Sequence, residues 1–129
     1  MKRILLVDDE PALLDVLREH FKGRYETDTA LSGTAALERF AARRPDVVFL
    51  DISMPELNGM EVLKRMRQSD PDVVVVMVTA TTDLAVTEAC LKAGAFGYVP
   101  KPFNLLYIDH MAALATAHAR PRRGVSATR

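Results

Sequence analysis

Short hydrophobic runs alternate with longer amphipathic stretches along the chain. Ile4–Val7, Val47–Leu50 and Val73–Val78 are continuously apolar, which is typical of parallel strands that helices cover on both faces. Phe96–Val99 is a shorter run of the same kind, and Tyr25–Thr29 is β-prone but polar, as expected for an edge strand. The pattern therefore predicts five strands, the second of which lies at an edge.

The segments between these runs have the length and periodicity of helices. Apolar residues recur at helical spacing after Pro11, within Thr34–Ala42, after Asn58, within Leu84–Ala93 and from Asn104 to about Ala119. Asn58 and Asn104 are suited to cap helices, and Gly94 is a typical helix stop. One helix is therefore expected after each strand.

Five strand–helix repeats predict a single α/β domain, in which a doubly wound five-stranded parallel sheet lies between two helical layers. A polar second strand at the edge and central first, third and fourth strands fit the strand order 2-1-3-4-5. This three-layer sandwich hosts many unrelated activities and assigns none by itself.

Composition argues against disulfide-rich, zinc-binding, membrane-spanning and secreted proteins. The 129 residues are 49% apolar, enough for one core, and the lone cysteine, Cys90, excludes an internal disulfide framework and a clustered zinc site. The longest apolar run, Val73–Val78, is far shorter than the roughly 20 residues of a membrane span, and the N-terminal apolar stretch stops at Asp8, unlike a signal peptide. We therefore expect a cytoplasmic protein with no membrane contact.

The net charge is zero but unevenly distributed. Four arginines follow the last acidic residue, Asp109: they are Arg120, Arg122, Arg123 and Arg129. Without them, 13 basic residues face 17 acidic ones, a net charge of −4, which argues against direct nucleic-acid binding. We expect residues 1–120 to form the domain and residues 121–129 to form a basic tail or the start of a linker.

The residues that follow the predicted strands carry the candidate chemistry. Asp8 and Asp9 follow the first strand, Asp51 the third, Thr79 the fourth and Lys101 the fifth. In an open parallel sheet, ligands bind beyond the carboxyl ends of the strands, where strand order reverses, here between the first and third strands. The three carboxylates are therefore expected to gather there, with the hydroxyl and the amine to one side.

Three neighbouring carboxylates repel one another and need a cation. Oxygen ligands with no histidine or cysteine nearby favour a hard ion, and Mg²⁺ fits best. A lysine and a hydroxyl beside the metal can donate to a phosphoryl oxygen, and a carboxylate that acts as a nucleophile forms an acyl phosphate. The residues thus indicate phosphoryl transfer onto an aspartate.

Four motifs, in this order and spacing, resemble the receiver domain of two-component response regulators over about residues 2–119. They are Val7–Glu10, Asp51–Gly59, Val78–Ala80 and Lys101–Phe103. One such motif would be weak evidence, whereas four together are specific. The resemblance implies a flavodoxin-like fold and a signalling switch that is not a turnover enzyme.

The resemblance also implies roles for single residues. Asp51 matches the phosphoacceptor, and Lys101 the lysine that pairs with the phosphoryl group. Asp8 and Asp9 match the acidic pair that holds Mg²⁺, with Asp9 the direct ligand. Ser53 occupies the place where a backbone carbonyl completes the metal site, and no other cofactor is implied.

Two further residues match the family's switch. Thr79 corresponds to a hydroxyl that moves toward the phosphoryl group, and Tyr98 to an aromatic side chain that swings inward when it does. The Lys101–Pro102 bond resembles one that is cis in the family. Ser53 and Thr81 occupy positions where side chains affect the lifetime of the phosphoryl group.

The implied partner is a sensor histidine kinase or phosphotransfer protein, with an output domain or partner protein that reads the fourth helix, fifth strand and fifth helix. The helix predicted to end near Ala119 is apolar nearly all round, so we expect it to form a homodimer surface together with Leu84–Ala93. Alternatively, its many alanines expose little apolar area.

Simpler interpretations exist for each residue taken alone. Asp8 and Asp9 could cap the first helix, and Tyr98 could be a half-buried strand residue. His20, His110 and His118 show no ligand spacing and are expected at the surface, and Cys90 is expected in the core.

Two other functions are weighed against the switch. A phosphatase of the aspartyl-phosphate type resembles Asp-x-Asp at its nucleophile, whereas position 53 is serine. A docking module that no longer needs phosphate would tolerate decay of the site, whereas Asp8, Asp9, Asp51, Thr79 and Lys101 are all present.

Overall fold

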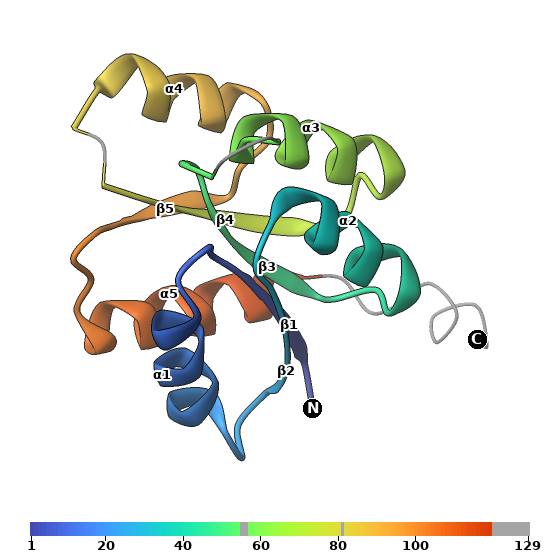
Figure 1. Cartoon of the computed structure of the whole chain (residues 1–129), viewed down its shortest axis with the longest axis vertical. Helices are drawn as coiled ribbons and strands as arrows, with labels where there is room; N and C mark the ends of the chain where they lie inside the picture. Colours follow the sequence, from blue (N-terminus) through green and yellow to red (C-terminus); the bar gives the residue numbers. More distant parts are fainter. Residues whose placement is uncertain (55–56, 81, 120–129) are drawn as a thin grey trace.

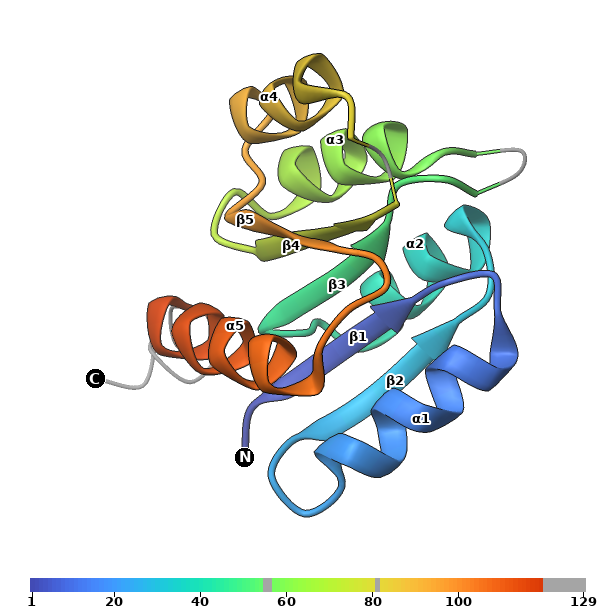
Figure 2. The ribbon, with the colours of Figure 1, turned by 90° about the vertical axis from the view of Figure 1, so that its left-hand side faces the viewer.

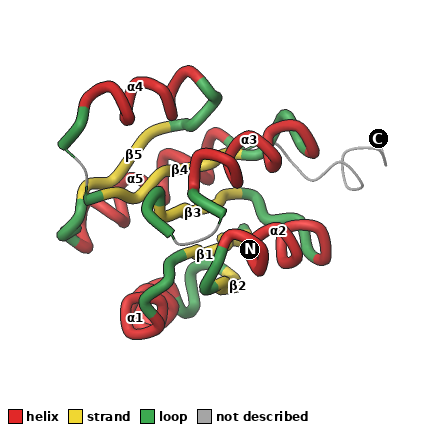
Figure 3. The backbone as a smooth tube through the Cα atoms, turned by 45° about the horizontal axis from the view of Figure 1, so that its top comes forward, coloured by secondary structure: helices red, strands yellow, loops and turns green. Residues whose placement is uncertain are grey.

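In the computed structural model of the chain, residues 1–54, 57–80 and 82–119 are described, and within them five strands alternate with five helices (Figures 1 and 3). The strands are β1 (Arg3–Val7), β2 (Glu26–Ala30), β3 (Val47–Asp51), β4 (Val74–Thr79) and β5 (Gly97–Pro100). The helices are α1 (Pro11–Phe21), α2 (Gly33–Ala42), α3 (Gly59–Ser69), α4 (Leu84–Lys92) and α5 (Leu105–His118). The expected basic tail, residues 121–129, lies outside the described residues.

The sheet has the predicted order, β2-β1-β3-β4-β5, and every strand pair is parallel. Helices α1 and α5 cover one face of the sheet, and α2, α3 and α4 cover the other (Figures 1 and 2). The doubly wound three-layer fold is therefore confirmed. Strand order reverses between β1 and β3, which places the carboxyl ends of these strands at the expected ligand position.

The sheet separates two hydrophobic clusters because successive side chains of a strand point to opposite faces. Ile4 and Leu6 of β1 belong to the cluster with α1 and α5, whereas Leu5 and Val7 belong to the cluster with α2 and α3. All four side chains are buried, which explains why β1 is apolar at every one of these positions. Only Ala30 of β2 is buried, as expected for the polar edge strand.

The ends of the strands differ from the predicted ends by about one residue. For the starts of β2 and β5, the hydrogen bonds of the preceding residue explain the difference. Tyr25 precedes β2 because its N–H donates to the carbonyl of Phe21, and its ring packs edge-on against that of Phe21 at 5.3 Å. Phe96 precedes β5 and donates its N–H to Val75 at 2.7 Å.

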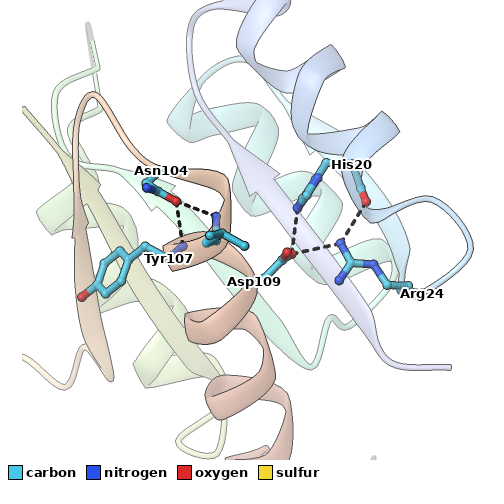
Figure 4. Close-up of polar contacts among 6 residues, drawn as sticks. His20, Arg24, Asn104, Tyr107 and Asp109 are labelled. Carbon is cyan, nitrogen blue, oxygen red and sulfur yellow. Dashed lines mark hydrogen bonds and ion pairs between the residues drawn. The ribbon is translucent and has the colours of Figure 1, made fainter.

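The expected helix signals are present. Asn58 caps α3 by accepting a backbone N–H bond at 3.0 Å. Asn104 caps α5 by accepting from the N–H groups of Leu106 and Tyr107 at 2.7 and 3.3 Å (Figure 4). Gly94, beyond the end of α4, has a φ of +107°, a conformation that favours glycine. Local capping chemistry therefore sets these helix ends.

His20 is not the plain surface residue that its sequence context suggests. Its Nε2 lies 2.7 Å from Asp109 Oδ1, and Nη2 of Arg24 lies 3.0 Å from the same oxygen (Figure 4). This cluster ties the end of α1 to the first turns of α5. Cys90 is buried as expected, and none of the described helices combines the length and the apolar character needed to cross a bilayer.

Candidate functional site

The carboxyl ends of β1 and β3 bring three aspartates together. Val7 pairs with Leu50 in the parallel register, so Asp8 and Asp51 follow side by side. One carboxylate oxygen from each of Asp8, Asp9 and Asp51 lies within 4.8 Å of the other two. Asp8 and Asp51 are buried and Asp9 is exposed, so the cluster opens to solvent on the Asp9 side.

Lys101 reaches this cluster from the end of β5. Its backbone N–H donates to the carbonyl of Thr79 at 2.7 Å, which fixes the chain beside the end of β4. Its Nζ lies 2.8 Å from Asp8 Oδ2 and 3.5 Å from Asp51 Oδ2. Glu10 also approaches, with Oε1 at 3.8 Å from Nζ, a contact that the sequence did not indicate. The following Lys101–Pro102 bond is cis, as expected.

Burial and charge act together on the titrating groups. Burial raises the pKa of Asp51 and the charge of Asp8 raises it further, and together they outweigh the Ser53 N–H and the Lys101 ammonium, which lower it. Burial alone would lower the pKa of Lys101, but its bond to Asp8 and the charges of Asp51 and Asp8 reverse this and raise it. Lys101 is therefore charged at neutral pH, and the Asp51 carboxylate is poorly solvated.

The donor set fits a hard divalent cation. Asp8, Asp9 and Asp51 offer only oxygen ligands, within reach of a single ion, and one of them is open to solvent. Asp8 Oδ1 also accepts the Glu10 N–H at 2.9 Å, whereas the N-cap of α1 is Glu10, with no side-chain cap bond. Helix capping therefore does not account for the aspartate pair.

Of the remaining predicted site residues, Ser53 contacts the cluster directly, whereas Thr79 and Tyr98 lie on β4 and β5. Ser53 donates its N–H to Asp51 Oδ1 at 3.1 Å, which orients the carboxylate. Thr79 is buried at the end of β4, and Tyr98 on β5 is 38% exposed, beside a hollow of about 340 Å³. Thr81 lies outside the described residues.

Gly59 is a residue of this site that sequence reasoning did not single out. Its N–H donates to the carbonyl of Ile52 at 3.1 Å, which brings the start of α3 against the end of β3. A Cβ at this position would lie 2.5 Å from the Asp51 carbonyl oxygen and 2.7 Å from Ile52 Cα. Its place directly after the Asn58 cap was the available signal.

Comparisons with known proteins agree with this geometry. A sequence profile described as "Response regulator receiver domain" matches residues 4–113. The regulatory protein AtoC of Escherichia coli (strain K12) is 42% identical over 106 residues, 81% of this chain and 23% of AtoC. The response regulator MprA of Mycobacterium sp. (strain KMS) is 42% identical over 105 residues, 80% of this chain and 45% of MprA. A receiver-domain crystal structure from Clostridium thermocellum has a TM-score of 0.85 at 30% identity, covering 91% of this chain and 95% of that one.

The chain spans less than half the length of these two curated relatives, so the likeness concerns their receiver parts. The profile matches most of the chain, and the fold has the same strand order that the receiver motifs imply. The chain therefore belongs to the receiver-domain family of two-component response regulators.

Proposed function

We propose that the chain is a phospho-accepting switch in which Asp51 receives a phosphoryl group from a sensor histidine kinase or phosphotransfer protein. The observation that carries the proposal is the position of Lys101 Nζ, 2.8 Å from Asp8 and 3.5 Å from Asp51, where strand order reverses. A cation held beside two buried carboxylates is suited to phosphoryl oxygens that enter the same space.

In the proposed transfer, an oxygen of the Asp51 carboxylate attacks phosphorus in line. The new O–P bond forms as the P–N bond of the donor phosphohistidine breaks, and its electron pair stays on the imidazole nitrogen. Lys101 stabilises the charge on the phosphoryl oxygens. Asp8, Asp9, Asp51 and the backbone carbonyl of Ser53 would hold Mg²⁺, which when bound neutralises phosphoryl charge.

Thr79 and Tyr98 would carry the signal to the surface. They lie on neighbouring strands, and the Tyr98 side chain stands partly in solvent in this structure. We expect the Thr79 hydroxyl to move toward the phosphoryl oxygens and the Tyr98 ring to move inward. This shift between two existing states would repack the face formed by α4, β5 and α5. Hydrolysis of the acyl phosphate would reset it.

Two observations favour this switch over the alternatives. Ser53 stands where an aspartyl-phosphate-type phosphatase would need its acid/base aspartate, which counts against turnover. A phosphate-independent docking module has no need for a lysine placed between Asp8 and Asp51. The output would be an attached domain or a partner protein, and the acidic body makes direct nucleic-acid binding unfavourable.

Fluorine NMR tests the switch, because the chain has only three tyrosines to label with 3-fluorotyrosine. Adding Mg²⁺ and beryllofluoride, a mimic of the phosphoryl group, should shift the Tyr98 resonance, which the Tyr98→Phe variant identifies. The shift should vanish in Asp51→Asn and weaken in Thr79→Ala. A Tyr98 resonance unchanged in the wild-type chain, with beryllofluoride bound, would contradict the switch. A shift that persists in Asp51→Asn would support the docking module.

Exposed large apolar side chains on α4, β5 and α5 support a homodimer as part of this proposal. They are Leu84, Leu91, Tyr98, Leu105, Leu106, Tyr107 and Leu114. Leu84 and Leu106 are 79% and 77% exposed, and a second copy would bury them. Light scattering after size exclusion, with Mg²⁺ and beryllofluoride, should show a dimer that Leu106→Asp abolishes. A wild-type monomer under these conditions would contradict the dimer.

A further inference from the structure

The outer edge of the sheet carries a groove that the proposed switch does not use. The groove has a volume of about 410 Å³ and follows β2, which is an edge strand of the sheet. Helices α1 and α2 lie on opposite faces of the sheet near this strand (Figure 2). Its lining consists of three arginines, Arg18, Arg39 and Arg43, together with Thr27, Asp28, Thr29 and Ala42. The residues belong to β2, to α1 and to α2 with its C-cap Arg43, so the groove spans the edge of the sheet.

The groove is cationic on an acidic body. The side chains of Arg18 and Arg43 are exposed and make no ion pair with any described carboxylate. Asp28 is the one carboxylate among the lining residues, and Arg3 on β1 already binds it at 3.2 Å. Residues 1–119 carry a net charge of −4, so the groove is locally positive on a domain that is negative as a whole.

The backbone of β2 also faces the groove. Among the described strands, β2 pairs with β1 alone. The N–H of Glu26 donates to the carbonyl of Lys2, and the carbonyl of Ala30 accepts from the N–H of Asp8, the two residues that flank β1. Because backbone groups of alternate residues in a ladder point to the same side, Thr27 and Thr29 present their N–H and carbonyl groups to the outer edge.

Arg39 contacts this edge through one hydrogen bond and leaves the other outward backbone groups of β2 open. Its Nε donates to the carbonyl of Thr29 at 3.0 Å, which fixes the guanidinium beside the strand. The two Nη groups remain available to a carboxylate, and the outward N–H groups of Thr27 and Thr29 have no bond to another described residue.

We propose that this groove binds an extended acidic segment of a partner protein, which adds as a strand along the outer edge of β2. Successive side chains of a strand point to opposite faces, so neighbouring acidic residues would reach Arg18 on the α1 side and Arg39 and Arg43 on the α2 side. The backbone groups of Thr27 and Thr29 would set the register. A second copy of this chain fits poorly, because it would bring the same arginines together.

Fluorescence anisotropy with a labelled peptide of about eight consecutive Asp and Glu residues tests the proposal on the unphosphorylated chain. We expect binding that weakens at least about tenfold in the double variant Arg18→Gln/Arg43→Gln. The matched control, Lys64→Gln/Lys92→Gln, removes the same charge from exposed positions on α3 and α4 and should stay within about twofold of wild type. An all-Gln/Asn peptide should not bind.

Amide hydrogen exchange separates strand addition from charge attraction alone. The N–H groups of Thr27 and Thr29 should exchange more slowly when the acidic peptide is bound. The proposal is overturned by absence of peptide binding, by equal weakening in both double variants, or by binding that leaves these two amides unchanged. In the last case, displacement of the peptide by inorganic polyphosphate would identify a site for small polyanions instead.

Discussion

Lys101 bears on stability as well as on the proposed chemistry. Its ammonium is the cation nearest to two carboxylates, Asp8 and Asp51, whose side chains are 5% and 4% exposed. The pKa of Asp51 is raised, by burial first and then by the charge of Asp8, even with this ammonium present. Without it, two close charges would share a poorly solvated space.

We expect Lys101→Met to lower the free energy of unfolding at neutral pH by about 1–3 kcal/mol, less than for a fully buried pair because the Lys101 side chain is 19% exposed. A carboxyl whose folded-state pKa lies above its unfolded value loses stability as pH rises through the folded-state pKa. The deficit should therefore shrink at acidic pH.

Urea unfolding at acidic and neutral pH measures this deficit. Lys64→Met, at an exposed position on α3, is the matched control and should change the free energy of unfolding by less than about 0.5 kcal/mol. A Lys101→Met deficit of the same size at both pH values would contradict the electrostatic explanation.

The close packing around Gly59 predicts that any larger side chain at this position destabilises the fold. Its missing Cβ leaves room for backbone atoms of Asp51 and Ile52, which lie in buried structure and cannot move aside like a flexible side chain. We expect Gly59→Ala to destabilise the fold by about 1–3 kcal/mol. Gly97→Ala, where the nearest atom would be the flexible end of Met111 at 3.5 Å, should cost less. Thermal unfolding of both variants measures the difference, and equal costs would refute the close-approach argument.

The gathering of Asp8, Asp9, Asp51 and Lys101 at one edge of the sheet could be predicted from sequence, because each lies at or just after the end of an apolar run. The motifs include Glu10 and Gly59, but their contacts could not be predicted, because these depend on atoms of other elements: Lys101 Nζ for Glu10 and the Asp51 carbonyl for Gly59. The role of a side chain in Mg²⁺ binding or phosphoryl transfer stays a prediction for Asp8, Asp9, Asp51, Ser53, Thr79, Tyr98 and Lys101.

At the scale of elements, α1 and α5 are tied by a polar cluster on the surface of the domain. Burial acts to raise the pKa of Asp109, but the hydrogen bonds from Arg24 and His20 outweigh it and hold that pKa below its usual range. A carboxyl with a lowered folded-state pKa contributes stability above its unfolded-state pKa, and this contribution is lost as pH falls through the folded-state value.

We therefore expect Asp109→Asn to lower the free energy of unfolding at neutral pH by less than about 1 kcal/mol, because the side chains of Asp109, His20 and Arg24 are all partly exposed. The difference should disappear at acidic pH, where Asp109 of the wild type is itself protonated. Asp15→Asn on the exposed face of α1 is the control. Urea unfolding at both pH values measures the effect, and a deficit that persists in acid would show that charge is not its cause.

The elements themselves were largely predictable, whereas the contacts between them were not. Continuous apolar runs identified β1, β3 and β4, and Asn58, Asn104 and Gly94 identified helix ends, because both signals are local. The His20–Asp109 contact joins residues 89 positions apart, and no local pattern marks it. The same holds for the three arginines of the β2 groove: Arg18 lies on α1, Arg39 on α2, and Arg43 directly after α2.

At the scale of the whole molecule, Mg²⁺ binding should couple to folding. A ligand that binds only the folded state stabilises it by about 2.7 kcal/mol at roughly 100 times its dissociation constant, enough to raise the melting temperature by several degrees. Asp9→Ala should abolish this gain, whereas Asp15→Ala, exposed on α1, should keep it. Differential scanning calorimetry with and without Mg²⁺ measures it. A full gain in Asp9→Ala would remove Asp9 from the proposed metal site.

The central claim is that Asp51 accepts a phosphoryl group in an Mg²⁺-dependent reaction. Intact mass spectrometry after incubation with Mg²⁺ and acetyl phosphate tests it most directly, on the wild-type chain and on Asp51→Asn. We expect one added phosphoryl group on the wild type alone, dependent on Mg²⁺ and removed by hydroxylamine, as for an acyl phosphate. The same adduct on Asp51→Asn, or none on the wild type at any Mg²⁺ concentration, would contradict the account.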